Sequence, residues 1–413
     1  MKLGSRQKII LAVMPTLFVC LSPRAFATAS GKAAPGKAEP RASATAAGQA
    51  RTAPQGNAGE KQPLAGDFFK NVQVLRDIPV DEFMGTMGFI SASLSLNCLD
   101  CHVDASASDF SKYAEDTPIK ATARRMIVMV NAMNKEHFGG ARVLTCYTCH
   151  RSDVRPKFVP SLAEQYGMPP PPDPNDIEII GPPDPKAPTA EQIIDKYLDA
   201  IGGAQKLAAL KSFVGRGTYA GYETDFAKFP AEIYAKAPNQ RTTIVHPPGG
   251  DNTTAFDGNI GWVAATNTQL PIDPLTGGEL DGVRLDAEMA FPGNIKQDLT
   301  RLMVGFPPVD LDDHHVQVVQ GTAQGGSRVK LYFDKDSGLL LRLVRFADTA
   351  LGLNPTQIDY SDYREVAGVK MPFHYVVAWT DGREEFDLTD VQANVAIDAA
   401  KFGKPAPPKK TNP

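Results

Sequence analysis

The chain has 413 residues, which is enough for two or three domains of ordinary size. Apolar residues make up 42% and charged residues 22%, so at least one sizeable core can be buried. A formal net charge of −4 argues against a nucleic-acid-binding protein, which would carry a basic surface. Four of the five cysteines lie in two Cys-x-x-Cys-His motifs, which is not the pattern of a disulfide scaffold.

The first 27 residues have the pattern of a cleavable export signal. Basic residues precede an apolar run at 9–21, and an A-x-A cleavage site follows at 25–27. The run is shorter than the roughly 20 residues that a membrane-spanning helix needs. The alternatives are a lipid anchor on Cys20 and a retained membrane anchor, but the bulky Val19 disfavours lipidation. We therefore expect an exported, periplasmic or extracytoplasmic protein, with membrane association left open.

Composition divides the rest of the chain into five parts. Residues 28–63 are rich in Ala, Gly and Pro and carry no aromatic residue, which predicts a flexible, disordered linker. A compact unit at 64–156 follows, then a Pro-rich connector at 157–188. A larger unit at 189–403 and a polar tail at 404–413 complete the chain.

The first compact unit is expected to be mainly helical. Apolar residues recur at helical spacing after Pro79. A second helix begins after Thr117, an N-cap followed by Pro118, and ends at Gly139-Gly140. Each helix precedes a loop and a Cys-x-x-Cys-His motif, so one helix–loop–motif unit is used twice.

The second unit has the alternating pattern of an antiparallel β domain with one or two helices. A helix is expected at 189–210, ahead of the strands. The clearest hairpin is at 328–346, where residues 334–338 form the turn. Further strands are expected within 213–226, 231–238, 315–321, 356–379 and 385–394.

The two Cys-x-x-Cys-His motifs are the strongest chemical signal, because this spacing is the attachment signature of a c-type haem. Two thiols one helical turn apart can form thioethers with the two vinyl groups, and the next residue places an imidazole under the iron. The motifs comprise Cys98, Cys101 and His102, and Cys146, Cys149 and His150. A redox dithiol and half of a zinc site are the alternatives, but 44 residues lie between Cys101 and Cys146, more than in a zinc ribbon. We predict two covalently attached haem c groups.

A sixth iron ligand is expected from a methionine on the helix before each motif, a common choice that raises the reduction potential relative to two imidazoles. The candidates are Met84 and Met87 for the first motif, and Met126, Met129 and Met133 for the second. The helical spacing of the last three also fits core methionines. The residues alone therefore leave the choice open.

Four short segments resemble the cytochrome subunit of bacterial photosynthetic reaction centres. They include both motifs and parts of the helices before them, at 71–89, 97–102, 123–126 and 145–151. That family carries four haems in two duplicated halves, and this chain resembles one half, over about 64–156. The resemblance implies that Met87 ligates the first haem iron and Met126 the second. His137 lies where the family has a ligand for a haem of the other half. That half is missing, so we expect His137 to be structural or exposed.

The larger unit resembles, more loosely, the half-barrel of the outer-membrane lipoprotein carrier, in its leading helix and in residues 363–377. This implies an incomplete barrel around a helix, able to hold an acyl chain, so an apolar ligand is one candidate partner. A docking or spacer role is the favoured alternative. Asp312, Asp313, His314 and His315 form a candidate metal cluster, for which a solvated loop is the favoured interpretation.

The main hypothesis is an exported di-haem c-type cytochrome that transfers single electrons between periplasmic or membrane redox partners, with a photosynthetic reaction centre as one candidate. Two six-coordinate irons leave no site for a substrate, so we expect an electron carrier and not an enzyme. A second hypothesis is a lipid or apolar-ligand binding module with an accessory redox-sensing haem domain. A third is a five-coordinate haem with peroxidase-like activity.

Overall fold

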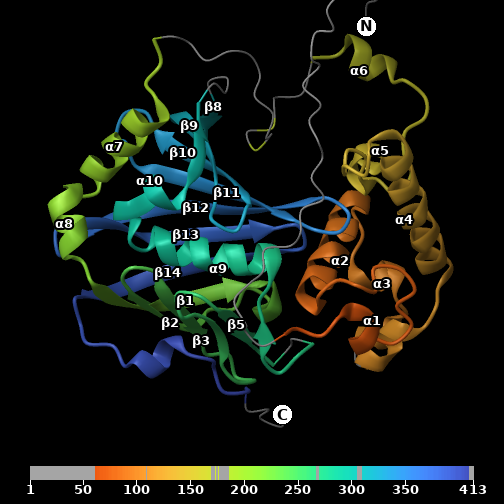
Figure 1. Cartoon of the computed structure of the whole chain (residues 1–413), viewed down its shortest axis with the longest axis horizontal. Helices are drawn as coiled ribbons and strands as arrows, with labels where there is room; N and C mark the ends of the chain where they lie inside the picture. Colours follow the sequence, from red (N-terminus) through yellow and green to blue (C-terminus); the bar gives the residue numbers. More distant parts are fainter. Residues whose placement is uncertain are drawn as a thin grey trace, which may run out of the picture. The chain divides into compact units, whose positions relative to one another are not determined.

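The computed structural model describes residues 61–107, 109–168, 173, 175, 186–266, 269–304 and 309–408. The expected export signal, most of the expected linker and much of the Pro-rich connector lie outside these residues. Two parts are distinguished below: the helical region, within 61–168, and the sheet region, within 186–408 (Figure 1). No helix in the described residues is long and apolar enough to cross a membrane.

The helical region contains both predicted helices. Helix α2 (Val80–Leu94) follows Pro79 and has two acidic residues in its first turn, where the helix dipole favours negative charge. Helix α4 (Pro118–His137) begins at the predicted cap, because the Thr117 hydroxyl accepts the Lys120 N–H at 3.2 Å. The other elements are α1 (Ala65–Phe68), α3 (Cys98–Cys101), η1 (Asp104–Ala107), η2 (Phe110–Ala114), α5 (Cys146–His150) and α6 (Leu162–Tyr166).

The strands described in the sheet region form one antiparallel sheet in the order β6-β5-β4-β3-β2-β1-β14-β13-β12-β11-β10-β9-β7, with β8 paired to β9. Each strand pairs mostly with its neighbour in sequence, and the β1–β14 pair joins the two ends of the series. The bounds are β1 (Ser212–Gly221), β2 (Phe229–Lys236), β3 (Gln240–Val245), β4 (Asn252–Phe256), β5 (Gly261–Ala264), β6 (Asp273–Pro274), β7 (Thr300–Met303), β8 (Val309–Leu311), β9 (His314–Thr322), β10 (Arg328–Asp334), β11 (Leu340–Asp348), β12 (Leu353–Val366), β13 (Val369–Trp379) and β14 (Gly382–Ala393).

The sheet curves around helix α9 (Gly277–Met289), which contacts β3, β4 and β5 on one arm and β11 on the other (Figure 1). The predicted antiparallel β domain is therefore confirmed, and the enclosed helix comes from the middle of the domain. Its other helices are α7 (Ala190–Ala200), α8 (Gly203–Ala209), α10 (Ile295–Asp298) and the short η3 (Tyr222–Thr224), η4 (Pro292–Asn294) and η5 (Ala399–Phe402).

The helix expected over 189–210 is divided into α7 and α8. Gly202 precedes α8 and Gly203 begins it, with φ values of +141° and +81°, a conformation that residues with side chains rarely adopt. The chain therefore turns at this pair, and α8 packs against β13 while α7 packs against β7 and β9.

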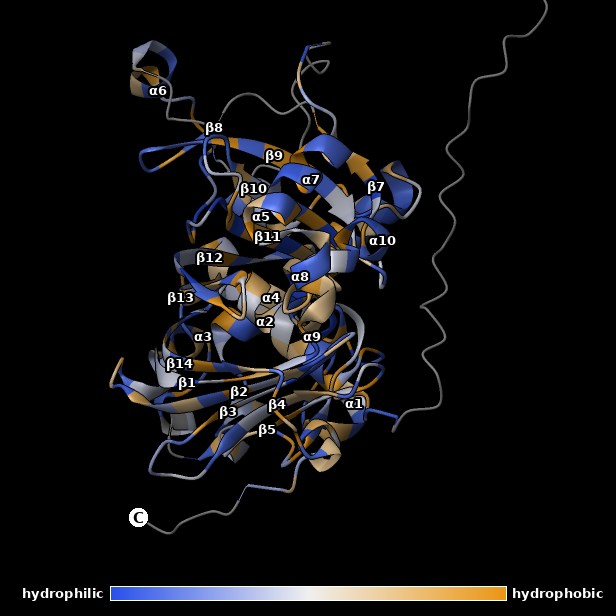
Figure 2. Cartoon of the chain, turned by 90° about the vertical axis from the view of Figure 1, so that its left-hand side faces the viewer, coloured by the Kyte–Doolittle hydropathy of each residue, from blue (hydrophilic) through white to orange (hydrophobic). Residues whose placement is uncertain are grey.

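Alternating side chains of the strands build the main core of the sheet region. Along β2 the buried residues Ala231, Ile233 and Ala235 alternate with less buried ones, and Figure 2 shows hydrophobic and hydrophilic residues interspersed along the strands. The inward side chains pack against α7, so that Ile194, Leu331 and Leu343 are almost wholly buried. This burial is the main source of stability in the sheet region.

Leu331→Ala should lower the free energy of unfolding by about 2–5 kcal/mol, because it leaves a cavity in this core. Urea unfolding followed by circular dichroism measures the change. Tyr222→Ala is the matched control, because Tyr222 is 58% exposed and its loss should cost less than about 1 kcal/mol. Equal effects of the two substitutions would contradict the assignment of Leu331 to the core.

Glu288 on α9 is a buried carboxyl group with an unusual titration. Neither of its side-chain oxygens has a hydrogen-bond partner among the described residues. Burial, with a smaller contribution from Asp298, raises its pKa to about 7. The folded state therefore binds a proton that the unfolded state releases, so stability falls as the pH rises from about 5 to 8.

Glu288→Gln should remove this pH dependence, because the amide stays neutral. The free energy of unfolding should decrease by about 1–2 kcal/mol between pH 5 and 8 in the unchanged protein, and by less in the variant. Melting temperatures measured across this range test the difference. Parallel pH profiles for the two proteins would show that Glu288 does not titrate as described.

Candidate haem sites

The first motif forms the single helical turn α3, which is held at its start by a reciprocal cap. The Asn97 side-chain oxygen accepts the N–H groups of Leu99 and Asp100 at 2.9 and 3.2 Å, and the Asp100 carboxylate accepts the Asn97 N–H at 2.8 Å. The cap fixes Cys98 and Cys101 one turn apart. Burial, aided by the charge of Asp100, raises the pKa of the Cys101 thiol.

The second motif forms α5 and has the same kind of cap. The Thr145 hydroxyl accepts the Thr148 N–H at 3.2 Å, and the Thr148 hydroxyl accepts the Thr145 N–H at 3.1 Å. Cys146 is half-buried against the cluster of Phe89 and Ile127, whereas Cys149 is exposed. The capping signal was present in the sequence as Asn or Thr before each motif, with Asp or Thr three residues later.

Each motif histidine is oriented by a backbone carbonyl. Nδ1 of His102 lies 3.2 Å from the Tyr113 oxygen, and Nδ1 of His150 lies 3.0 Å from the Asp153 oxygen. A carbonyl can only accept, so Nδ1 donates in both rings, which leaves Nε2 as the nitrogen that could bind a metal. This is the usual arrangement of a histidine that binds a metal through Nε2.

The surroundings of the His102 ring favour its neutral form. Its centroid lies 4.7 Å from that of the Tyr113 ring. Burial lowers the pKa of His102, and the positive charge of Lys120 lowers it further. Neutral imidazole is the form that ligates iron.

Helix α4 is attached to both motifs. At its start, the Thr117 hydroxyl donates to the Cys101 carbonyl at 2.7 Å. Near its end, the buried Asn134 side chain accepts the Leu144 N–H at 2.9 Å and donates to the Leu144 carbonyl at 2.7 Å, just before α5. The two candidate sites are therefore built on one shared helix.

The methionines of α4 are not core residues. The buried face of the helix carries Ile127, Val130 and Asn134. The neighbouring face carries Met126, Met129 and Met133, which are 36%, 44% and 39% exposed. The alternative of core methionines is therefore wrong. An apolar stripe that the protein leaves uncovered is available to a haem.

The two methionines of α2 have different surroundings. Met87 is half-buried. Met84 is 41% exposed and lines a cavity of about 460 Å³ together with residues of the sheet region, including Arg345 and Trp379. This orientation of Met84 favours Met87 as the ligand for the first motif.

His137 is the last residue of α4 and is exposed, in agreement with one of the two alternatives expected for it.

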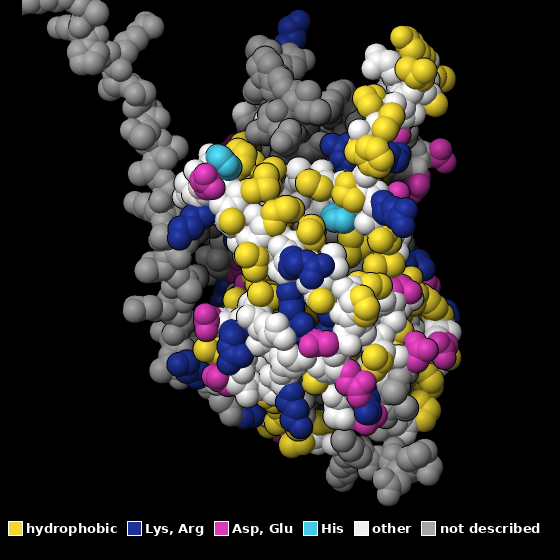
Figure 3. Space-filling model, turned by 90° about the vertical axis from the view of Figure 1, so that its right-hand side faces the viewer, with side chains coloured by type: hydrophobic (Ala, Val, Ile, Leu, Met, Phe, Trp, Pro, Cys, Tyr) yellow, Lys and Arg dark blue, Asp and Glu magenta, His cyan; other side chains and the backbone are white. Residues whose placement is uncertain are grey.

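Apolar surface is concentrated in the helical region. Of the 22 large apolar side chains that are exposed among the described residues, 18 lie there. Figure 3 shows hydrophobic side chains gathered on this side of the molecule, with Lys and Arg among them. Such surface normally marks a binding site. Together with two capped thiol pairs and two oriented imidazoles, it fits one haem at each motif.

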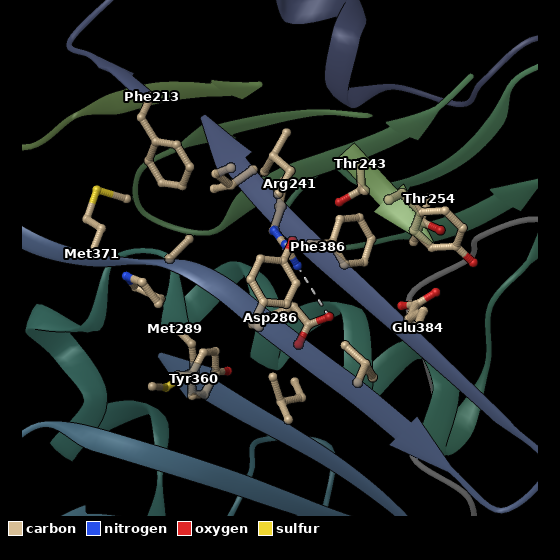
Figure 4. A pocket seen from close by; sticks show the side chains of 18 of the residues that line it. Phe213, Arg241, Thr243, Thr254, Asp286, Met289, Tyr360, Met371, Glu384 and Phe386 are labelled. Atoms are coloured by element: carbon tan, nitrogen blue, oxygen red, sulfur yellow. Dashed lines mark hydrogen bonds and ion pairs between the residues drawn. The ribbon is translucent and has the colours of Figure 1, made fainter. Parts of the chain in front are cut away.

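The sheet region contains a cavity of about 360 Å³ on its concave side (Figure 4). Apolar and aromatic side chains such as Phe213 and Phe386 line it, and an ion pair crosses it, with Arg241 Nη1 3.4 Å from Asp286 Oδ2. Burial raises the pKa of Asp286, and the Arg241 guanidinium opposes part of that shift. The lining therefore combines apolar and aromatic side chains with a paired guanidinium and carboxylate.

The candidate metal cluster at 312–315 lies where β8 turns into β9. His314 pairs with Asp334 at 3.2 Å and His315 with Asp310 at 2.5 Å, so the two rings engage different carboxylates. In the described part of the chain, the one close group of three metal-ligating side chains is instead His374, Glu385 and Asp387, where the Lys228 ammonium already lies 2.6 Å from Asp387.

Comparison with known proteins finds relatives of the part of the chain that contains the helical region. Residues 28–167 match the family model described as photosynthetic reaction centre cytochrome C subunit. This part of the chain resembles that cytochrome family. The subunit of Thermochromatium tepidum is 40% identical over 102 residues, which are 23% of this chain and 24% of the relative. The subunit of Rubrivivax gelatinosus is 36% identical over 101 residues, 24% and 26% of the two chains. The match to the cytochrome subunit therefore spans about a quarter of the length of these curated relatives.

Solved structures similar to part of this chain have low sequence identity to it. A DUF1329 family protein from Desulfovibrio piger has 13% identity and a TM-score of 0.38, over 52% of this chain and 97% of its own. A LolA superfamily protein from Nitrosomonas europaea has 16% identity and a TM-score of 0.36, over 53% and 99%. The comparisons therefore return relatives of both kinds that the sequence resemblances named.

Proposed function

We propose that this chain is an exported di-haem c-type cytochrome that passes single electrons between periplasmic or membrane redox partners. The observation that carries the proposal is the repeated site: a capped Cys-x-x-Cys turn, an imidazole with Nδ1 held by a carbonyl, and exposed apolar surface nearby. A photosynthetic reaction centre is one candidate partner, because the matched relatives are cytochrome subunits of reaction centres.

The residues have distinct roles in this proposal. Cys98 and Cys101 hold the first haem, and Cys146 and Cys149 the second, as covalent attachments. His102 and His150 would each supply an imidazole ligand to one iron, and Met87 and Met126 would supply the thioether ligands. When bound, a haem with two protein ligands supplies reversible one-electron exchange and offers no open site for a substrate. The protein holds and orients the ligands and limits the access of water.

A redox titration of the full chain tests this function. Two one-electron transitions per chain are expected, with low-spin ferric spectra, because both irons have two protein ligands. Reduced protein should not bind carbon monoxide readily and should not turn over peroxide. A high-spin ferric spectrum with peroxide turnover would instead indicate an open coordination site and an enzyme.

The second candidate function is a binding module for an apolar ligand, favoured by the cavity of about 360 Å³ in the sheet region. In that case the haem region serves as an accessory redox sensor. Solvent extraction of the purified full chain followed by mass spectrometry distinguishes the two functions. A stoichiometric apolar molecule supports the binding module, and its absence from protein purified without detergent supports a docking or spacer role.

A further inference from the structure

One face of helix α2 is attached to the sheet region through a buried carboxylate. Asp81 is only 6% exposed, and its oxygens accept the Thr276 N–H at 2.5 Å and the Thr276 hydroxyl at 2.7 and 2.8 Å. Thr276 directly precedes α9 and provides no side-chain cap of its own. The carboxylate from α2 therefore lies at the N-terminus of the helix that the sheet encloses, where a negative charge is stabilising.

Two further contacts lie along the same face of α2. The Asn354 side chain on β12 donates to the Gly85 carbonyl at 2.7 Å. The Phe89 ring packs with Leu351 so closely against Gly352 that a Cβ there would lie 2.3 Å from the ring. The α2 helix is thus held at three successive turns by loops and strands of the sheet region.

The helix repeat places Met87 away from these contacts. Asp81, Gly85 and Phe89 are four residues apart and share one face. Met87 is two residues beyond Gly85, so its side chain leaves the helix about 160° away from the Gly85 position. The sheet region therefore fixes the back of the helix whose other side carries the proposed iron ligand.

We propose that the sheet region is a positioning element for the first haem, with Asp81, Thr276 and Asn354 as positioning residues that fix the approach of Met87 to the iron. This role rests on the proposed function, in which Met87 is an axial ligand. A thioether is a weak, neutral ligand held in place only by the backbone that carries it. Loosening the back of α2 therefore makes Met87 easier to displace, while Met126 on α4 is unaffected.

The test uses the full chain with its haems and perturbs α2 from the sheet side. Thr276→Val removes the hydroxyl bonded to Asp81, and Asn354→Ala removes the donor to Gly85. Each variant is compared with the unchanged protein by the Met–iron charge-transfer band of the ferric state and by titration with imidazole, which binds only where methionine leaves. The apparent dissociation constant of imidazole at the first haem should fall roughly tenfold. Loss of one charged or buried hydrogen bond should weaken the competing Met87 ligation by about that factor.

Two further variants separate positioning from general stability. Asp81→Asn keeps a side-chain oxygen that can accept from Thr276, so it should stay close to the unchanged protein, whereas Asp81→Ala should weaken Met87 binding as the sheet-side variants do. Ser93→Ala is the control on the same helix. Ser93 is buried and its hydroxyl donates to the Phe89 carbonyl at 2.7 Å, a bond within the helix, so its loss should leave the imidazole titration unchanged.

The outcomes separate this inference from the function on which it rests. If the unchanged protein shows a Met87 band but the sheet-side variants alter only the unfolding midpoint, the contact is structural and the positioning role is wrong. If the unchanged protein shows no band that depends on Met87, both the axial ligation and the positioning role are wrong. A selective effect on the first haem, with the band of Met126 intact, supports both.

Discussion

Met87→His should lower one of two reduction potentials and abolish one of two Met–iron charge-transfer bands, leaving the other unchanged. Imidazole is a stronger donor to ferric iron than a thioether and so stabilises the oxidised state. Met126→His should do the same at the second haem. Potentiometric titration and near-infrared spectra of the ferric protein measure both effects, and the two variants should affect different haems.

Three other methionines serve as controls. Met84, Met129 and Met133 are all partly exposed, so their replacement by Leu should preserve both bands and cost little stability. If Met129→Leu removes a band while Met126→Leu does not, the ligand of the second haem lies one helical turn further along α4. Met126 would then be one of the side chains that merely cover the haem.

Replacing Cys146 and Cys149 together by Ala should leave a chain with a single covalent haem at the first motif. The loss should also destabilise the helical region, because Cys146 packs with Phe89 and Ile127 and the α5 turn would lose its cofactor. Denaturing mass spectrometry counts the haem, and thermal unfolding followed in the Soret region measures the stability. The matched variant with Cys98 and Cys101 replaced should keep only the second haem. A protein that retains two haems after either change would contradict the attachment sites.

The local elements of the helical region could be predicted because their signals are local. Thr117 and Pro118 mark the start of α4, and the glycines at 139 and 140, with φ values of +60° and +85°, mark its end. The spacing within each motif places two thiols and an imidazole on one turn. The carbonyl partners of His102 and His150 were not predicted, because they depend on how the chain returns after each motif.

Contacts between distant segments could not be predicted. The resemblance implied a helix inside the half-barrel but did not say which one, and α9 has no strong periodic pattern to mark it. The Asp81–Thr276 contact joins residues far apart in sequence, and Asp81 alone looks like an ordinary acidic residue in the first turn of a helix. The exposure of Met126 also depends on tertiary packing, because the same spacing fits a core stripe.

The central claim, two covalent haems on one chain, is tested most directly by denaturing mass spectrometry of the full protein made in a host with a c-type haem maturation system. The account predicts the mass of the polypeptide plus two haems, reduced to one by loss of either cysteine pair. A chain that carries no haem or only one under these conditions would contradict the account.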